Sequence, residues 1–312
     1  MKINILIPVY NDWGSLNFLL EEIPKIKKNK KSKITSIDIT IINDYSSIPA
    51  FISKKNEQLN IKILELKKNV GSQLAINIGL NYLDKYNNDF DYFIVMDSDG
   101  EDKATDIISL LEVAKKNKNK IIFASRGKRQ DGFLFYILYK IYLFIFISLT
   151  GKNINIGNFS CIPKNLLNHI KRLENSKIHH SASILRSNLA FDKIKCDRGK
   201  RFMGKSKMSL KNLILHGLNG LAIFFDLILK RFYILFIFLI ISGTITNSFL
   251  KNVELNSFFE TLIKLIYQKF DFIILVFLLI SILTLSILKI INNKIKKFLK
   301  IKGKINYLKN NE

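Results

Sequence analysis

The chain has 312 residues, of which 48% are hydrophobic, and its formal net charge at pH 7 is +24. This length accommodates one domain of about 200 residues and a smaller part. The basic residues cluster beside long apolar runs, which favours contact with a membrane over binding of nucleic acid. The two cysteines, Cys161 and Cys196, form neither a metal-binding nor a disulfide pattern, so we expect both to be reduced in a cytosolic compartment.

Short β-branched runs alternate with longer mixed segments through the first half of the chain. The opening run, MKINILIPVYND, has only about six consecutive apolar residues, so it predicts a buried first strand rather than a signal peptide. Helices are predicted around 16–26, 72–85 and 105–116, between the runs SIDITIIND, IKILELKKN, DYFIVMD and IIFASR. This alternation predicts an α/β domain with a parallel sheet that is covered on both faces.

Polar residues stand at the ends of the predicted strands, where parallel sheets bind their ligands. IPVYND ends the first strand, and IINDYSS ends the second, with Asp44 at its tip. Gly71 follows the third strand and opens a helix whose free amide groups can face a polar ligand. Asp97 and Asp99 end the fourth strand and repel each other unless a cation lies beside them. A divalent ion that is also held by a diphosphate meets this need.

Three long apolar runs follow. We expect the run at 133–149, which contains Lys140 and several tyrosines, to form a helix in the membrane surface, with a buried core helix or a true span as the alternatives. The runs at 232–250 and 272–291 are each about 20 residues long, enough to cross a hydrocarbon core of roughly 30 Å. Both are predicted to span the membrane.

Basic residues flank these two spans on one side, since Lys230 and Arg231 precede the first and a series of lysines ends and follows the second. The positive-inside rule therefore puts the N-terminal domain and both termini in the cytoplasm, at an inner or plasma membrane. The predicted organisation is a domain at 1–210, a juxtamembrane amphipathic segment at 211–231, a two-helix transmembrane hairpin at 232–291 and a basic tail at 292–312. Because spans of separate protomers can pack against each other, a homo-oligomer stays among the alternatives.

The ordered motifs resemble those of the family 2 glycosyltransferases with the GT-A fold, over about residues 2–207. IPVYND resembles I-P-x-Y-N-E, with Asp12 in place of Glu, and IINDYSS resembles V-D-D-G-S, with Asn43 and Tyr45 replacing the first Asp and the Gly. MDSDGED resembles the D-A-D-L-Q-D of polyprenyl-phosphate transferases. The resemblance implies a Rossmann-like GT-A domain followed by two transmembrane helices. It also implies inverting, metal-dependent transfer of a sugar from a nucleoside diphosphate sugar to a membrane lipid, with polyprenyl phosphate as the favoured acceptor.

The resemblance implies roles for single residues. Asp99 and Glu101 would hold Mg²⁺ or Mn²⁺, and Arg126, in FASRGKR, would act in catalysis with Asp97 and Asp99. His180 lies where many family members place an acidic base, and it is a candidate to deprotonate the acceptor, although a structural histidine is the alternative. An acceptor phosphate needs a base less, because its oxygen is already anionic at neutral pH.

Further implied contacts involve phosphate groups. DRGKRFMGKSK resembles R-x-x-x-G-x-S-K, a segment that would close over the diphosphate, although a basic patch on the membrane surface is the alternative. The acceptor phosphate would be held by Arg126, Arg129 and Lys140. The nucleotide sugar would be bound by Pro8, Tyr10, Asp12, Asp44, Gly71, Asp97, Arg201 and Lys207.

Two other functions stay open. An enzyme of the same fold can act on a hydroxyl of a lipid-linked glycan or glycolipid in cell-envelope polysaccharide synthesis, where a base is required. A catalytically inactive membrane-anchored binding protein is the alternative of another class, and Asn43 together with the absence of an evident acidic base gives it mild support.

Overall fold

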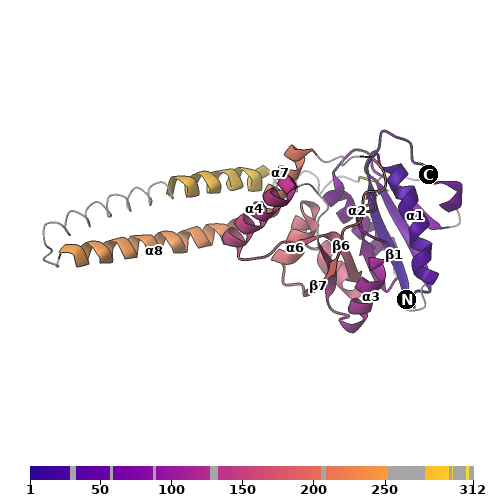
Figure 1. Cartoon of the computed structure of the whole chain (residues 1–312), viewed down its shortest axis with the longest axis horizontal. Helices are drawn as coiled ribbons and strands as arrows, with labels where there is room; N and C mark the ends of the chain where they lie inside the picture. The colour runs from indigo at the N-terminus through magenta and orange to yellow at the C-terminus, as the bar shows by residue number, and fades with distance from the viewer. Residues whose placement is uncertain are drawn as a thin grey trace.

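A seven-stranded sheet forms the centre of the α/β domain (Figure 1). The computed structural model describes residues 1–28, 33–56, 59–86, 89–126, 133–204, 209–251, 278–294, 297 and 307–308. The strand order is β3-β2-β1-β4-β6-β5-β7. The strands are β1 (Lys2–Val9), β2 (Ser36–Asn43), β3 (Asn60–Glu65), β4 (Tyr92–Val95), β5 (Ile121–Arg126), β6 (Ile156–Pro163) and β7 (Phe191–Cys196).

The α/β class is confirmed, but the prediction of a parallel sheet is wrong at β6. This strand runs antiparallel to both β4 and β5, whereas the other pairs are parallel. The chain leaves β5 at one edge of the sheet, passes through the long apolar helix α4 (Phe133–Thr150) and enters the sheet again at the same edge as β6. A short apolar run does not reveal such a reversal, because its hydrophobicity reports burial and not direction.

Helices cover both faces of the sheet, as predicted. Alternate residues of β1 explain this: Ile3, Ile5 and Ile7 join one buried cluster, while Leu6 joins the other. Helices α1 (Trp13–Lys28) and α3 (Asp106–Lys116) pack in the first cluster, and α2 (Ser72–Tyr86) and α5 (Lys164–Lys171) pack in the second. The remaining short elements are η1 (Lys54–Asn56), η2 (Glu174–Lys177) and α6 (His180–Arg186). The packing brings the carboxyl ends of β1, β2 and β4 to one edge.

A helical arm extends from the domain (Figure 1). It contains α4, α7 (Leu210–Ala222), α8 (Phe225–Lys251) and a helical segment at 278–294. At its base, Phe146, Phe224, Ile228 and Leu288 form a third buried cluster, in which the rings of Phe146 and Phe224 meet edge to face with centroids 5.3 Å apart. Ile178, Ala182 and Leu185 of the α/β domain belong to the same cluster, so packed apolar side chains join the arm to the domain.

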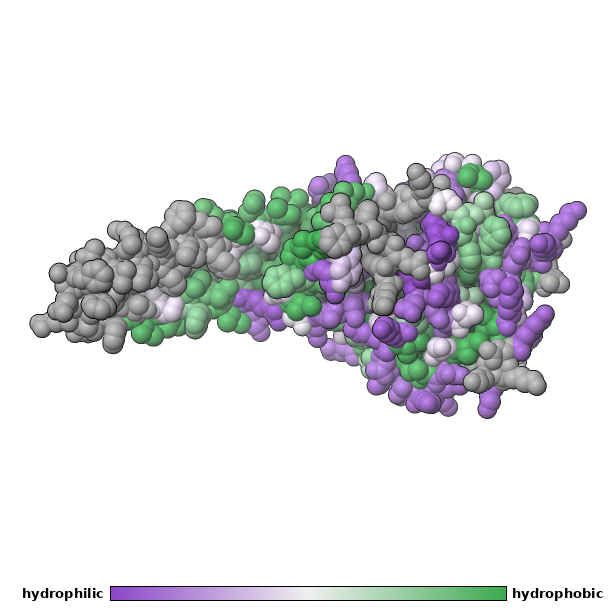
Figure 2. Space-filling model, viewed as in Figure 1, coloured by the Kyte–Doolittle hydropathy of each residue, from purple (hydrophilic) through white to green (hydrophobic). Residues whose placement is uncertain are grey.

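Within the part of the chain that the structure describes, one helical stretch is long and apolar enough to cross a membrane. It covers residues 225–245 of α8, and 6% of its most apolar window is buried. The first predicted span, 232–250, lies inside α8. The prediction of two spans is not confirmed, since 272–277 lie outside the described residues and the helix at 278–294 falls short of this length. Figure 2 shows apolar side chains gathered along the described parts of the arm and polar ones over the domain.

The surface of α4 is mostly open rather than enclosed. Phe146 is fully buried, but Tyr136 and Ile141 are exposed and Phe144 is 73% exposed. One side of α4 thus packs on the base of the arm while the rest of its apolar surface has no covering in the described part of the chain.

Candidate functional site

The loops after β1 and β2 are joined side by side at the carboxyl edge of the sheet. Val9 and Asn43 are paired in register, and Asn11 Oδ1 accepts hydrogen bonds from the amides of Ser47 (2.8 Å) and Ile48 (3.1 Å). Asn11 has a φ of 52° and Tyr45 a φ of 61°. Asparagine tolerates this left-handed conformation, but a tyrosine there is strained.

Asp44 anchors the loop before α2. Its carboxylate is buried and accepts hydrogen bonds from the backbone amides of Val70 (2.7 Å) and Gly71 (2.8 Å). Asn69 adds a side-chain hydrogen bond to the Asp44 carbonyl oxygen (3.1 Å). Gly71 has a φ of 83°, which suits glycine. Asp44 therefore shapes the loop around Gly71, a role that the sequence did not predict.

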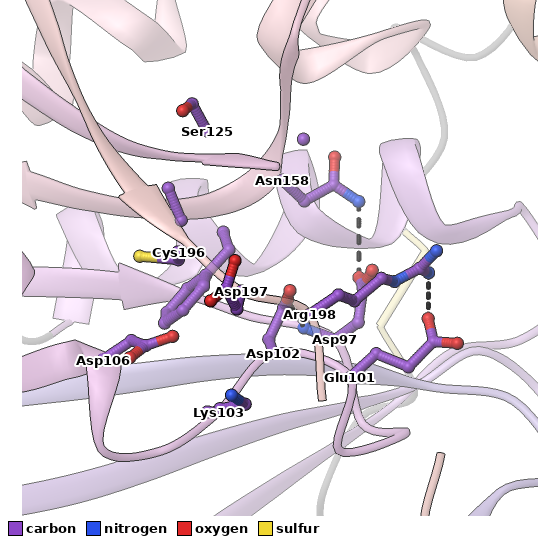
Figure 3. A pocket seen from close by; sticks show the side chains of 13 residues that line it. Asp97, Glu101, Asp102, Lys103, Asp106, Ser125, Asn158, Cys196, Asp197 and Arg198 are labelled. Carbon is purple, nitrogen blue, oxygen red and sulfur yellow. Dashed lines mark hydrogen bonds and ion pairs between the residues drawn. The ribbon is translucent and has the colours of Figure 1, made fainter. Parts of the chain in front are cut away.

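The acidic loop, residues 97–102, follows β4 and is folded by its own side chains. The amide of Asp97 donates to Asp102 Oδ2 (3.0 Å), and the amide of Glu101 donates to Asp99 Oδ1 (3.0 Å). Asn158 Nδ2, from β6, donates to Asp97 Oδ1 at 3.3 Å (Figure 3). Asp102 is thus part of the loop's internal framework.

The arginine segment, residues 198–204, lies against the acidic loop. Arg198 forms an ion pair with Glu101 (Figure 3), and Arg201 donates to Asp99 Oδ2 at 2.9 Å and forms an ion pair with Asp12. Two backbone hydrogen bonds fix the segment, from Gly199 to the Glu101 carbonyl (2.8 Å) and from Phe202 to the Asp99 carbonyl (3.0 Å). The predicted diphosphate contact Arg201 is therefore brought to the predicted metal ligand Asp99.

Glycine is needed where the two segments meet. A Cβ atom at Gly199 would lie 2.7 Å from the carbonyl oxygen of Gly100, and one at Gly100 would collide with the Phe202 ring. Gly100 also has a φ of 84°. The close approach of these backbones places the guanidinium groups on the carboxylates.

A cleft opens between the acidic loop, β6 and the end of β7 (Figure 3). Two of its lining residues are basic, Lys103 and Arg198, and Ser125 adds a hydroxyl group. Burial and the neighbouring Asp106 carboxylate raise the pKa of Cys196 to about 12, so its thiol is protonated and is not a nucleophile at neutral pH. Burial also raises the pKa of Asp106. The acidic lining residues are Asp97, Glu101, Asp102, Asp106 and Asp197.

His180 lies in the interior rather than at the cleft. Its side chain is fully buried beside the Phe123 ring, and burial lowers its pKa to about 4. Neither ring nitrogen has a hydrogen-bond partner among the described residues. Its backbone amide donates to Gln73 Oε1 (2.6 Å), and Gln73 Nε2 donates to Asn158 Oδ1 (3.0 Å). His180 thus connects to Asp97 through its backbone, by way of Gln73 and Asn158, two residues that sequence reasoning missed.

The other predicted site residues are dispersed. Pro8 is buried in β1 opposite Ile42, and Tyr10 is exposed at the loop after that strand. Lys140 is exposed on α4, with its ammonium group 5.4 Å from the centroid of the Tyr136 ring. Three predicted phosphate contacts, Arg129, Lys207 and the side chain of Arg126, lie outside the described part of the chain.

Asp99 and Glu101 suit a divalent ion only when a bound ligand supplies further oxygen atoms. Among the described residues, no three His, Cys, Asp or Glu side chains converge on one point. Asp99 and Glu101 supply the hard oxygen atoms that Mg²⁺ and Mn²⁺ prefer, and Mg²⁺ is commonly held by one or two carboxylates together with substrate phosphates. The donor set fits this kind of site.

Residues 4–177 match the profile of Glycosyl transferase family 2, and the chain belongs to this family. The protein is a glycosyltransferase, as its motifs predicted. It is 22% identical over 230 residues to the uncharacterized glycosyltransferase YkcC of Bacillus subtilis, covering 72% of this chain and 68% of that protein. It is 27% identical over 224 residues to an undecaprenyl-phosphate 4-deoxy-4-formamido-L-arabinose transferase of Photorhabdus laumondii, covering 68% of this chain and 65% of that protein.

A solved structure shares the fold. Glucosyl-3-phosphoglycerate synthase from Mycobacterium tuberculosis, in complex with Mn²⁺, UDP-glucose and phosphoglyceric acid, aligns with a TM-score of 0.51 at 10% identity, covering 73% of this chain and 79% of that one. The expectation of a GT-A glycosyltransferase domain is confirmed.

Proposed function

We propose that the protein transfers a sugar from a nucleoside diphosphate sugar to a lipid phosphate at a membrane surface, and that polyprenyl phosphate is the acceptor. The observation that carries the proposal is the pairing of Arg198 and Arg201 with the acidic loop at the carboxyl edge of the sheet. The Photorhabdus laumondii relative, which is named for an undecaprenyl-phosphate acceptor, supports the choice of lipid.

The donor would lie over the ends of β1, β2 and β4. Tyr10 and Asp12 would face the nucleotide from the loop after β1, and the Gly71 loop, fixed by Asp44, would border it on the other side. The sugar would enter the cleft, where carboxylates together with Ser125 and Asn158 offer hydrogen-bonding partners for hydroxyl groups.

Donor binding would exchange the partners of two charged groups. Arg201 would leave Asp99 for the diphosphate, because a guanidinium group recognises phosphate oxygens with charge-assisted hydrogen bonds. Asp99 and Glu101 would then hold Mg²⁺ or Mn²⁺, which when bound offsets the charge that grows on the departing diphosphate. Arg201 and Asp99 would each have a partner of opposite charge before and after the exchange.

The acceptor phosphate oxygen would attack the anomeric carbon from the face opposite the diphosphate, with inversion. An anionic oxygen needs no general base, which agrees with a buried His180 whose pKa is lowered to about 4. Arg126, Arg129 and Lys140 are our candidates to hold the acceptor phosphate, and Lys140 lies on α4 at the base of the arm.

A hydroxyl acceptor on a lipid-linked glycan or glycolipid is the second candidate, and the acidic cleft favours it. A hydroxyl must lose a proton, and Asp197 offers a carboxylate in that cleft. Asp197→Asn decides between the two: loss of turnover with intact donor binding favours the hydroxyl, and unchanged turnover favours the phosphate.

For the membrane arrangement we propose the domain limits predicted from the sequence, with the catalytic domain at the cytoplasmic face of an inner or plasma membrane. If α8 crosses the bilayer, a second segment must cross back, because Leu308 pairs with Leu66 beside β3 in the α/β domain. The helix at 278–294 is the candidate for that return. The exposed apolar residues of α4 support a position of this helix in the membrane surface.

The test is a screen of UDP- and GDP-sugars against the purified full-length protein in detergent, with polyprenyl phosphate and Mn²⁺ or Mg²⁺. Product lipid is followed by mass. We expect one donor class to yield a monoglycosylated lipid phosphate only when a divalent ion is present. Sugar transfer to glycolipid hydroxyls alone would replace the proposed acceptor, and absence of glycolipid from every donor would refute the proposal.

A further inference from the structure

Near its C-terminal end, after the arm, the chain contacts the α/β domain again. Leu308 forms an antiparallel bridge with Leu66, and the amide of Lys67 donates to the carbonyl oxygen of Tyr307 at 2.9 Å. β3 is the last strand on this side of the sheet. The pair Tyr307–Leu308, here called the tail pair, therefore extends the sheet beyond β3 at the point where that strand ends.

The tail pair is packed and not merely adjacent. The Tyr307 side chain is 6% exposed and belongs to the buried cluster that also contains Leu64, Leu66 and Leu74, with Val70 packed against it. The ammonium group of Lys68 lies 5.6 Å from the centroid of the Tyr307 ring. Backbone pairing, apolar burial and a cation over the ring thus act on the same few residues.

These contacts fall on the segment that leads to the candidate nucleotide site. From Leu66 the chain runs to Gly71, and only three residues separate the tail-bound amide of Lys67 from Gly71. The amide of Gly71 donates to the Asp44 carboxylate. The segment 66–71 is therefore held at one end by the tail pair and at the other by Asp44.

We infer that the tail pair is a positioning element of the nucleotide site: its docking beside β3 holds the segment 66–71 in the conformation that binds the nucleoside diphosphate of the donor. The inference deepens the proposed function and depends on it. Residues 225–251 and 278–294 of the arm lie between the domain and the tail pair in the sequence. The donor site is therefore complete only after the arm has folded and the tail pair has docked beside β3. Tyr307 acts through the segment and does not touch the reacting atoms.

The test compares full-length wild type, Tyr307→Ala and Tyr307→Phe, with Tyr86→Ala as a control for loss of an aromatic side chain that is exposed on α2. The first measurement is hydrogen exchange of the amides of 66–71 without ligand. The second is the Kd of UDP and of GDP by calorimetry, and the third is kcat and KM for the donor. Tyr307→Phe keeps the ring and the backbone contacts.

We expect faster exchange at 66–71 in Tyr307→Ala and near wild-type exchange in Tyr307→Phe and Tyr86→Ala. If the undocked segment keeps its binding conformation for a tenth to a fifth of the time, the nucleotide Kd rises roughly five- to tenfold. The KM for the donor follows it, while kcat at saturating donor changes less than about twofold, because the lost contact is equal in ground and transition states.

The outcomes separate the two proposals. A wild type that binds nucleotide, with Tyr307→Ala equal to it in exchange and in Kd, overturns the positioning role alone. Faster exchange in Tyr307→Ala with an unchanged nucleotide Kd also overturns the positioning role alone. A wild type that is protected at 66–71 but binds neither nucleotide nor donor overturns the proposed function, and the positioning role with it.

Discussion

Replacing Arg201 with methionine tests whether this guanidinium exchanges partners. In the structure it donates to Asp99 (2.9 Å) and to the Met203 carbonyl (2.9 Å) and is ion-paired with Asp12. Methionine retains the apolar stem of arginine but carries no charge or donor, so Arg201→Met leaves two carboxylates without their shared cation. We expect the empty protein to lose stability, and we expect its affinity for Mn²⁺ and its turnover to change in opposite directions.

The loss of stability follows from these contacts. Hydrogen bonds to charged groups contribute about 1.5–3 kcal/mol, and removing one partner of a fully buried ion pair costs about 3–5 kcal/mol. The side chains of Arg201, Asp12 and Asp99 are 14–17% exposed, so solvent screening weakens the pairing below the fully buried limit. We expect the free energy of unfolding to fall by about 2–3 kcal/mol in the absence of ligands, measured by urea titration.

Metal binding and turnover provide the decisive assays. Without a guanidinium competing for Asp99, Mn²⁺ binding to the empty protein tightens roughly tenfold, equivalent to ~1.4 kcal/mol, while kcat/KM for the donor falls about 100-fold because the diphosphate loses a charged partner. Arg186→Met is the matched control, since Arg186 forms an ion pair with Asp226 and the acidic loop keeps both of its arginines. Unchanged Mn²⁺ affinity, or unchanged turnover in Arg201→Met, would refute partner exchange.

Three further predictions concern strain, protonation and the Gly71 loop. Tyr45→Gly relieves a left-handed tyrosine with a φ of 61°, so the free energy of unfolding by urea should rise by about 0.5–1 kcal/mol; a fall would show that the Tyr45 ring contributes more than its backbone costs. Burial lowers the pKa of His180 to about 4 from an ordinary 6.5, so as the pH falls the unfolded chain binds a proton before the folded protein does. The free energy of unfolding should therefore be unaffected by His180 above pH 6.5. It should decrease between pH 6.5 and pH 4, by at most ~1.4 kcal/mol per pH unit. His180→Phe should flatten this part of the pH–stability curve, and an unchanged slope would exclude His180 as its source. Asp44→Asn retains an acceptor but loses the charge-assisted bonds from Val70 and Gly71, which should cost about 1–2 kcal/mol of unfolding free energy and weaken UDP or GDP binding; wild-type affinity would exclude a role of this loop in nucleotide binding.

The sequence predicts much of the α/β domain because the relevant signals are local. The apolar runs of β1, β2 and β4 are compact, and polar residues follow each of them, so their ends can be recognised. Strand β6 is different, because its direction depends on the path through α4. Asn158 went unnoticed for this reason: a polar residue in an unpredicted strand gives no sign that it will face Asp97.

In the candidate site, too, the sequence reveals the types of residue but not which residues pair with each other. The acids at 97–102 and the basic residues at 198–207 are evident as motifs, but their direct pairing is not. Arg201 is about a hundred residues from Asp99 along the chain, and the contact depends on the close approach of Gly199 and Gly100. The tail pair is harder still, since two residues beside β3 carry no periodic pattern.

The arginine segment connects the acidic loop to the helices of the arm, so its pairing with the acidic loop does more than balance charge. The segment follows β7, and α7 begins a few residues after it, with the Ser209 hydroxyl accepting the Asn212 amide at its N-terminus. α7 and α8 share the buried cluster at the base of the arm with α4. A donor that displaces Arg201 therefore acts on a segment connected through the backbone to the helices that would meet the lipid. Under the proposed function, the acceptor side of the enzyme would respond to the filling of the donor side through this connection.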